Sequence, residues 1–326
     1  MELGEFPLLL APMEDVSDPP FRAVCKEQGA DLMYTEFISA EGLIRDAVKS
    51  VQKLDIYDYE RPIGIQIFGE KIASMREAAA IAEAAEPELV DINYGCPVKK
   101  VAGRGAGAGI LQDLPKMQAM TKEIVDNVAL PVTVKTRLGW DENTIKIMEV
   151  AQRLQDVGIQ ALTIHGRTRK QMYKGEANWD PIAEVKHHPG IHIPIFGNGD
   201  IDSPEKALAY RDKYQVDGIM IGRGAIGYPW IFKEIRHFLS TGEKLPGPTL
   251  EERLVTVKKH LDFSIEWKGD RKGIFEMRRH YSNYFRGFHR FKPYRMELVQ
   301  ADTYQQVNDI LDRIAQDAHL FQPALV

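Results

Sequence analysis

Of the two cysteines in the chain, only Cys96 stands where its thiol could take part in chemistry. It directly follows the β-rich segment 89–95 and precedes segment 103–109, in which every second residue is glycine. A glycine-rich loop of this kind can move over a bound substrate, and such lids commonly carry a catalytic group. Cys25 instead shares one face of a short predicted helix with Phe21 and is expected in the core. Cys96 is therefore the candidate reactive residue.

Other β-rich segments also bring polar or reactive residues to their ends. In chain order these residues are Pro12 and Met13, Glu36, Gln66, Asn93, Lys135 and Arg137, His165 and Arg167, Asn198, Gly199 and Asp200, and Gly222, Arg223 and Gly224. In a barrel of parallel strands all carboxyl ends meet at one rim, where such enzymes place the active site. Chance would distribute these groups over both ends of the barrel. The pattern therefore predicts one site built from nearly every strand.

Two of these ends, 197–199 and 222–224, have the glycines of a phosphate site. Backbone N–H groups can approach a phosphate closely there, and Arg223 adds a fixed charge that suits phosphate geometry. For each glycine motif taken singly, a plain tight turn is the alternative. Together, at the ends of the last two strands, they favour a phosphate site.

The remaining polar ends suit a flavin ring. Reduced flavin carries negative charge at its N1–C2=O edge, and Lys135 and His165 would supply the cations or donors that this edge needs. Gln66 could hydrogen-bond the other pyrimidine edge. The alternative for His165 is a structural histidine, but its occurrence in series with Lys135 and Gln66 favours the flavin.

The segments that must position these residues alternate with helical stretches. Eight β-rich runs occupy residues 6–13, 32–39, 63–69, 89–95, 131–138, 161–167, 193–199 and 218–224. Between them, 71–86 is rich in alanine, and 203–213 begins with the helix-capping sequence Ser-Pro-Glu. Strand and helix alternating eight times predict an α/β fold, a (β/α)8 TIM barrel. An open doubly wound sheet is the alternative, but it does not usually need eight units.

A smaller helical region follows the barrel. The last barrel helix is predicted to end near Ser240, and the sequence TGEKLPGPT, rich in Gly and Pro, is typical of a linker. Helices are predicted beyond it at 250–267, 271–290 and 303–318, without strand signals. We therefore divide the chain into a catalytic barrel, residues 1–242, and a small C-terminal helical bundle, residues 243–326.

Composition narrows the class of protein. With 44% hydrophobic and 27% charged residues, the chain has the composition of a soluble globular protein. No apolar run approaches the ~20 residues that span a bilayer, and the N-terminal sequence has an acid where a secretory signal has bases. Two cysteines are too few for a disulfide framework or a Cys-rich zinc site. We expect a cytoplasmic monomer without membrane association, obligate protein partner or metal.

Charge is unevenly distributed along the chain, whose net charge is −5. Residues 271–295 contain eight Lys or Arg and one acid, Glu276, against 34 Lys or Arg and 46 acids elsewhere. Seven aromatic residues are interleaved with these cations: Phe275, Tyr281, Tyr284, Phe285, Phe288, Phe291 and Tyr294. Cations beside rings that stack on bases are typical of RNA recognition. The alternative is a bundle helix with an aromatic core and a solvated basic face, which leaves the scarcity of acids unexplained.

Seven segments closely resemble the tRNA-dihydrouridine synthases, the flavin enzymes that reduce uridine in tRNA. In order they are LAPMEDVSDPPFR, GIQIFG, DINYGCPVKKVAGRGAGAGIL, VKTRLGW, IHGRTRKQMYKGEANW, IFGNGDI and MIGRGAIGYPWIF. The NYGCP and IHGRTR segments are specific, and the order of barrel and helical bundle is also similar. The GRGAG loop resembles that of the bacterial branch of the family.

The resemblance implies a role for each matching residue. It identifies Cys96 as the proton donor. It implies FMN contacts from Pro12, Met13, Glu14, Gln66, Lys135, His165, Asn198, Gly199, Asp200, Gly222 and Arg223. It places Asn93, Arg137 and Tyr173 around the target uracil. Glu14 departs from the family, in which small residues are common at this position, so its contact with FMN is expected through the backbone.

The implied reaction has two halves. NADPH, or NADH, reduces FMN, and hydride then passes from N5 of the reduced flavin to C6 of a uridine turned out of the RNA stack. Cys96 protonates C5, a role that suits a thiol because its ordinary pKa of about 8.5 keeps it protonated at neutral pH. Arg286 and Arg290, from the basic segment, are expected to contact phosphates of the tRNA.

Two other classes of function share part of this pattern. An FMN-dependent barrel reductase of a free small molecule, similar to dihydroorotate dehydrogenase, has the same barrel and phosphate site but no use for segment 271–295. A non-catalytic RNA-binding protein or chaperone explains that segment, but not the convergence of Gln66, Cys96, Lys135 and His165 on one rim. Reduction of tRNA uridines to dihydrouridine explains both.

Overall fold

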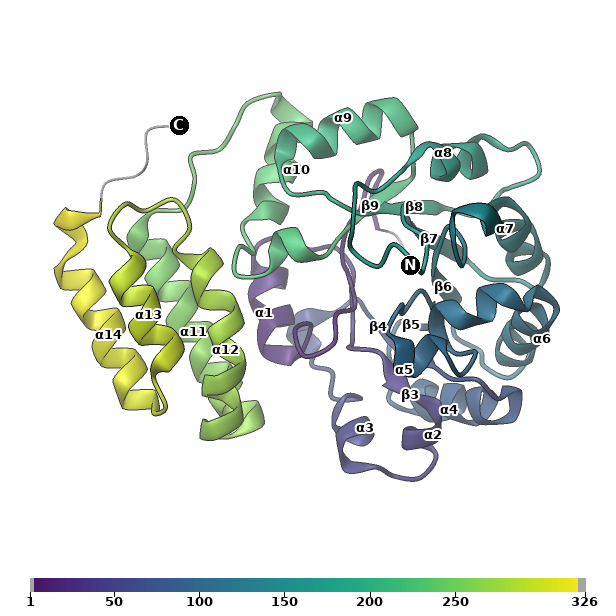
Figure 1. Ribbon diagram of the computed structural model, residues 1–326, viewed down its shortest axis with the longest axis horizontal. Helices are drawn as coiled ribbons and strands as arrows, with labels where there is room; N and C mark the ends of the chain where they lie inside the picture. The colour runs from purple at the N-terminus through teal and green to yellow at the C-terminus, as the bar shows by residue number, and fades with distance from the viewer. Residues whose placement is uncertain (1–2, 322–326) are drawn as a thin grey trace.

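The computed structural model describes residues 3–321 and shows a barrel of parallel strands beside a group of helices (Figure 1). Within these residues the strands are β1 (Leu8–Leu10), β2 (Met33–Tyr34), β3 (Ile38–Ser39), β4 (Ile63–Phe68), β5 (Leu89–Tyr94), β6 (Val132–Arg137), β7 (Ala161–His165), β8 (Ile195–Asn198) and β9 (Gly218–Ile221). The strand order is β1-β9-β8-β7-β6-β5-β4-β2, and every pair is parallel. A bridge between Leu9 and Leu32 joins the two ends of the sheet. The predicted (β/α)8 TIM barrel is therefore confirmed.

The second predicted strand, 32–39, is not continuous. It forms β2 and β3, which both pair with β4. Between them, the hydroxyl of Thr35 accepts a hydrogen bond from the backbone N–H of Gln66 (3.1 Å), in place of a main-chain carbonyl. Next to it, the carboxylate of Glu36 accepts a hydrogen bond from the N–H of Asp15 (2.6 Å). The Thr35 bond takes the place of a ladder bond to β4, and the Glu36 bond ties the β2–β3 break to the loop that follows β1.

Helices surround the barrel. They are α1 (Pro19–Glu27), α2 (Ala40–Leu43), α3 (Val48–Gln52), α4 (Ile72–Ala84), α5 (Lys99–Ala102), α6 (Leu114–Val125), α7 (Ile147–Asp156), α8 (Asp180–His187), α9 (Pro204–Tyr214) and α10 (Ile231–Thr241). The predicted cap of α9 is confirmed, since the side chain of Ser203 accepts a hydrogen bond from the N–H of Lys206. Cys25 is wholly buried on α1, as its helical spacing predicts.

Alternation along the strands separates an apolar layer from a polar interior. On β4, Ile65 and Ile67 pack into the main core between strands and helices, and Gln66 between them faces the barrel interior, where it hydrogen-bonds Asp91. The parallel register then aligns polar residues across strands: Asn93 lies beside Lys135, and Arg137 lies beside His165. Side chains far apart in sequence are thereby brought to one end of the barrel.

Four helices form a second hydrophobic core beside the barrel. They are α11 (Leu250–Lys268), α12 (Asp270–Tyr284), α13 (Lys292–Gln300) and α14 (Tyr304–Gln316). The predicted helix 271–290 is wrong beyond Tyr284, because Gly287 (φ 91°) and Arg290 (φ 60°) adopt left-handed backbone conformations that end a helix. Helix α13, which has Pro293 in its first turn, was not predicted. No helix within residues 3–321 is both long and apolar enough to cross a bilayer.

The aromatic residues of segment 271–295 mostly serve this second core. Tyr281, Tyr284, Phe285 and Phe291 are buried in it, whereas Phe275 is exposed. The structural alternative is therefore correct for these four rings, and they are not free to stack on bases.

A buried ionic contact joins the helices to the barrel. The ammonium group of Lys268, at the end of α11, pairs with Asp18 and with Glu276 (2.7 Å), and the Lys268 side chain is 3% exposed. Asp18 caps α1, which packs against α11. Although burial alone would lower it, the carboxylates of Asp18 and Glu276 raise the pKa of Lys268. Glu276, the single acid of the basic segment, therefore has a structural partner.

Lys268→Met should lower the free energy of unfolding by about 3–5 kcal/mol, because two buried carboxylates lose the cation that they share. Urea denaturation followed by circular dichroism measures this change. Lys258→Met is the control, since it removes an exposed pair with Asp312 and should cost less than about 1 kcal/mol. Equal and small losses in the two variants would contradict a stabilising buried contact at Lys268.

Candidate active site

A cavity of about 930 Å³ opens at the carboxyl ends of the strands, within the size range of sites for small ligands and cofactors. The predicted site residues that line it are Pro12, Met13, Glu14, Asn93, Cys96, Lys135, Arg137, His165, Tyr173, Asn198, Gly199, Asp200, Gly222, Arg223 and Arg286. Gln66 and Arg290 are not part of the lining. Gln66 is wholly buried inside the barrel, and Arg290 is exposed between α12 and α13.

Lys135 and His165 provide one cation and one neutral donor. The Nζ of Lys135 donates to Oδ1 of Asn198 (3.1 Å), and burial lowers the pKa of Lys135 to about 8. Burial, with Arg137 and Lys135 nearby, holds the pKa of His165 well below its ordinary value, so the ring is neutral. The Nη1 atom of Arg167 lies 3.3 Å from Nε2 of His165. Because an arginine can only donate, Nε2 accepts this hydrogen bond and the proton of the neutral ring is on Nδ1.

The ends of β8 and β9 gather groups that could hold an anion. Among the hydrogen bonds of the described residues, none is donated by the backbone N–H groups of Gly199, Arg223 and Gly224 at the cavity wall. The carboxylate of Asp200 pairs with Arg167 (2.7 Å) and Arg223 (2.8 Å), so it orients these cations and is itself neutralised. Free N–H groups beside guanidinium groups are suited to a phosphate.

Cys96 lies at the cavity wall with 6% of its surface exposed. Burial raises the pKa of its thiol, which is therefore protonated at neutral pH. The Oδ1 atom of Asn93 accepts hydrogen bonds from the N–H groups of Gly95 (2.9 Å) and Cys96 (2.8 Å). The site thus holds a protonated thiol, and the backbone that carries it is hydrogen-bonded to the side chain of Asn93.

The glycine-rich segment that was predicted as a mobile loop packs against Cys96. It begins at the C-cap of α5, Gly103, and runs into a 3-10 turn, Gly107–Gln112, in which the N–H of Ala108 donates to the carbonyl of Cys96 (3.1 Å). Gly107 has a positive φ of 51°, and a Cβ there would lie 3.0 Å from both Cβ and the carbonyl oxygen of Cys96. Only glycine therefore permits this close approach without displacement.

Arg137 supports the same backbone from β6. Its Nε donates to the carbonyl of Gly95 (2.7 Å), and Nη1 donates to the carbonyls of Thr168 (3.1 Å) and Met172 (2.9 Å). Burial lowers the pKa of Arg137 to about 10, so the group stays charged at neutral pH. Tyr173, which is half-exposed, has the guanidinium groups of Arg137 (5.8 Å) and Arg223 (5.2 Å) near its ring. Its ring is accessible from the cavity.

Gln66 has both ends of its amide engaged below the cavity wall. Its Nε2 donates to Oδ2 of Asp91 (2.6 Å), and its Oε1 accepts from Nδ2 of Asn93 (2.8 Å). Asp91 was not singled out from the sequence, and burial raises its pKa to about 6. The signal that could have found it is the polar alternation Asp91-Ile92-Asn93 on a wholly buried strand.

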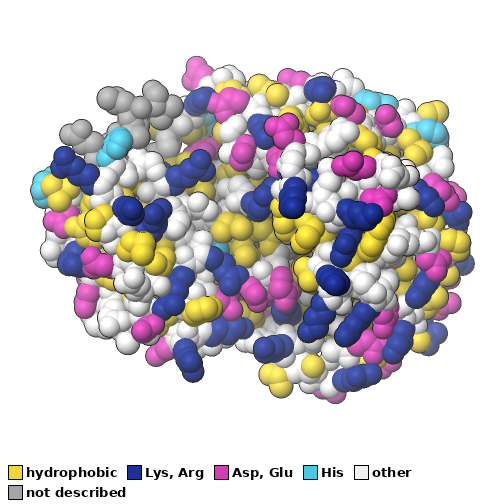
Figure 2. Space-filling view, in the orientation of Figure 1, with side chains coloured by type: hydrophobic (Ala, Val, Ile, Leu, Met, Phe, Trp, Pro, Cys, Tyr) yellow, Lys and Arg dark blue, Asp and Glu magenta, His cyan; other side chains and the backbone are white. Residues whose placement is uncertain are grey.

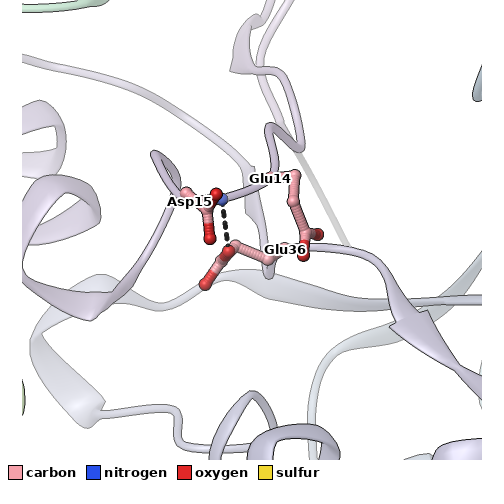
Figure 3. Close-up of side chains that lie close together, drawn as sticks. All are labelled: Glu14, Asp15 and Glu36. Carbon is pink, nitrogen blue, oxygen red and sulfur yellow. Dashed lines mark hydrogen bonds between the residues drawn. The ribbon is translucent and has the colours of Figure 1, made fainter. Parts of the chain in front are cut away.

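A second cavity, of about 710 Å³, adjoins the first at Cys96 and Glu14. At its edge the carboxylates of Glu14, Asp15 and Glu36 gather, as Figure 3 shows. Lys53, which was not predicted, contacts Glu14 (2.7 Å) and Glu36 (3.5 Å) with its ammonium group. The side chain of Glu14 is therefore directed to this ion pair.

The barrel, the N–H donors and guanidinium groups at its last two strands and the buried thiol at its mouth are typical of a TIM-barrel enzyme. The chain belongs to the dihydrouridine synthase (Dus) family, whose family model matches residues 9–319. Membership implies a flavin cofactor. The family resemblance stated from the sequence is confirmed.

Similar proteins agree with this assignment. The chain is 42% identical to probable tRNA-dihydrouridine synthase 1 of Synechocystis sp., over 96% of this chain and 87% of that protein. It is 41% identical to tRNA-dihydrouridine synthase B of Pseudomonas putida, over 84% of this chain and 80% of that protein. Among solved structures, histamine dehydrogenase from Rhizobium sp. 4-9 is similar over 80% of this chain but only half of its own, with a TM-score of 0.56 and 10% identity. That likeness concerns the fold alone.

The contact between Gly107 and Cys96 can be tested with two alanine variants. Gly105→Ala places a side chain at φ 84° with no atom within 4 Å, and should lower stability by about 1–2 kcal/mol through backbone strain. Gly107→Ala should cost about 1–3 kcal/mol more, because the new Cβ must displace the segment from Cys96. It should also speed alkylation of Cys96 by iodoacetamide, measured in a Cys25→Ala background. Unchanged alkylation in Gly107→Ala would mean that this segment does not cover the thiol.

Proposed function

We propose that this chain reduces uridines in tRNA to 5,6-dihydrouridine, with FMN as the bound flavin and NADPH as the reductant. The proposal is carried by one observation: a protonated thiol, an anion site and buried cations line one cavity in a chain of the dihydrouridine synthase family. Both relatives named above are tRNA-dihydrouridine synthases by name. As part of the proposal, residues 1–242 are the catalytic domain and 243–326 bind tRNA, in a cytoplasmic monomer.

The cavity fits FMN in charge and size. The N–H groups of Gly199, Arg223 and Gly224 would hold its phosphate, and Lys135 and the Nδ1–H of His165 would face its ring. Pro12, Met13, Asn198 and Gly222 would complete the walls. When bound and reduced, FMN supplies the hydride for C6 of the uracil. Gln66 and Asp200 have their polar atoms committed within the protein, so we assign them supporting roles.

The thiol of Cys96 gives its proton to C5 of the uracil. Burial keeps the thiol protonated, and Asn93 and Arg137 hold the backbone on which it stands. Nε and Nη1 of Arg137 are committed to carbonyl groups, and within residues 3–321 Nη2 donates to no protein acceptor, which leaves it for a uracil oxygen. The accessible ring of Tyr173 would stack on or beside the base.

Arg286 and Arg290 form the proposed contact with the tRNA backbone. Arg286 is exposed and lines the cavity, and buried Arg253 holds its loop by donating to the carbonyls of Tyr284 (2.7 Å) and Arg286 (3.1 Å). Figure 2 shows Lys and Arg side chains on both sides of the hollow between barrel and helices.

Two neighbouring arginines of the basic segment have partners within the protein. Arg278 pairs with Asp302 (2.8 Å), and Arg279 donates to the carbonyl of Asp15. We therefore do not assign them to tRNA. A reductase of a free small molecule, the alternative function, would leave exposed Arg286 and Arg290 without a role.

Cys96→Ala should leave FMN content and NADPH oxidation unchanged and slow dihydrouridine formation by ~10²-fold or more, because it removes only the acid for C5. Mass spectrometry of a tRNA substrate after incubation with NADPH measures the product. Cys25→Ala, which changes a thiol in the core, should turn over normally after folding and is the control. Normal dihydrouridine formation in Cys96→Ala would eliminate Cys96 as the proton donor.

The double variant Arg286→Ala, Arg290→Ala should bind tRNA more weakly and with a flatter salt dependence, by about one unit of log–log slope for each phosphate that the protein no longer neutralises. Affinity measured at several salt concentrations gives the slope. The control variant Arg76→Ala, Lys122→Ala removes two cations from the outer helices α4 and α6 and should keep the slope. If Arg286 and Arg290 merely solvate the helices, the slope will not change and only thermal stability will.

A further inference from the structure

The carboxylate of Asp91 is the buried end of a line of side chains that leads to Cys96. Asp91 is 1% exposed, and the strand register places it between Gln66 on β4 and Thr133 on β6. Its Oδ1 accepts a hydrogen bond from the hydroxyl of Thr133 (2.5 Å), and its Oδ2 accepts one from Nε2 of Gln66 (2.6 Å). Neither Asp91 nor Thr133 lines the cavity.

Two amide side chains connect this carboxylate to the backbone of Cys96. The Oε1 atom of Gln66 accepts a hydrogen bond from Nδ2 of Asn93 (2.8 Å). The Oδ1 atom of Asn93 in turn accepts hydrogen bonds from the backbone N–H groups of Gly95 (2.9 Å) and Cys96 (2.8 Å). The line therefore runs from Asp91 through Gln66 and Asn93 to Cys96.

The two ends of this line determine the orientation of both amides. An ionised carboxylate only accepts hydrogen bonds, so the NH2 group of Gln66 must face Asp91. Its oxygen then faces Asn93, whose own oxygen must face the two backbone N–H groups. If either amide were reversed, donors would oppose donors inside the barrel, and a buried donor without a partner is costly. The charge on Asp91 is what makes this single arrangement favourable.

We propose that Asp91 is a positioning residue for Cys96, acting through the amides of Gln66 and Asn93. The proposal rests on the proposed function in one respect, that Cys96 delivers the proton. The hydrogen-bonded line holds the Cys96 backbone from β4 and β5, while Arg137 holds the adjacent carbonyl of Gly95 from β6. The thiol is thereby placed from three neighbouring strands rather than by its own loop alone.

Charge compensation is a rival role for Asp91. Lys135 lies close enough to favour the ionised carboxylate, so Asp91 also offsets part of the positive charge at the cavity. A carboxylate that acts only on charge would change the reduction potential of the bound flavin when it is removed. A carboxylate that positions Cys96 would change the reactivity of the thiol and the second half-reaction, and leave flavin reduction alone.

A charge exchange between the first two residues of the line tests the positioning role. In Asp91→Asn the side chain can present either an oxygen or an NH2 group to Gln66, so both amide orientations become possible. In Gln66→Glu two carboxylates face each other. In the double variant Asp91→Asn, Gln66→Glu, the amide at 91 donates to the carboxylate at 66, which accepts from Asn93 as Gln66 does. The double variant removes this repulsion and also fixes the original direction of every hydrogen bond from position 66 up to Cys96.

Each single variant should slow dihydrouridine formation by about 10- to 100-fold, the scale of a misplaced catalytic group. The double variant should recover most of that loss, a strong non-additivity. Thr133→Val is the matched control: it removes the other hydrogen bond of the same carboxylate without reversing an amide, and should have the smallest effect. The rate of flavin reduction by NADPH should change much less than dihydrouridine formation in both single variants.

Alkylation of Cys96 across a pH series, in a Cys25→Ala background, gives a readout that does not depend on turnover. The profile should shift in both single variants and return in the double variant. If the alkylation profile shifts and returns in this way while all variants form dihydrouridine normally, Asp91 positions Cys96 but Cys96 is not the proton donor. The proposal would be overturned if the double variant recovered neither dihydrouridine formation nor the alkylation profile. It would also be overturned if the flavin potential shifted while the alkylation profile stayed unchanged.

Discussion

The parallel register of the barrel strands is the constraint on which the site depends. Residues two apart on one strand share a face, and the register sets them beside matching residues of the next strand. Asn93 thus lies beside Lys135, and Arg137 beside His165, which in turn lies beside Asn198. A slip of one residue would turn these groups toward the helices and bring isoleucines and valines into the cavity. The backbone ladder, rather than any single side chain, assembles the site.

Burial then sets the protonation state of each group. Charged forms lose solvation inside the barrel, so the pKa values of Lys135 and His165 fall and that of the Cys96 thiol rises. The outcome at neutral pH is a cation, a neutral donor and an intact acid within one cavity. Asp91 and Asp200 stay ionised because each accepts hydrogen bonds from fixed donors. Perturbed groups of this kind are typical of functional sites.

The helical region uses its residues for two purposes at once. Aromatic side chains of segment 271–295 fill the second core, and Glu276 shares buried Lys268 with Asp18 of the barrel. With the core and the barrel contact secured in this way, Arg286 and Arg290 remain exposed at the turn that follows α12. Arg253 holds this turn by donating to the carbonyl of Tyr284, at the end of α12, and to that of Arg286. The exposed arginines thereby stand on a turn that is hydrogen-bonded to buried Arg253.

By itself the sequence determined what depends on neighbours in the chain: the eight strand segments, the cap of α9, the core position of Cys25 and the placing of reactive groups at strand ends. Only the tertiary structure decided the break at Thr35, the end of α12 at Tyr284, the partner of Glu276 and the commitment of Gln66 to Asp91 and Asn93. Periodicity and capping act over a few residues, so one sequence reveals them. Gln66 and Asp91 are 25 positions apart, and Lys268 and Asp18 are far more distant. Such pairs are chosen by strand register and domain packing, which no local pattern records.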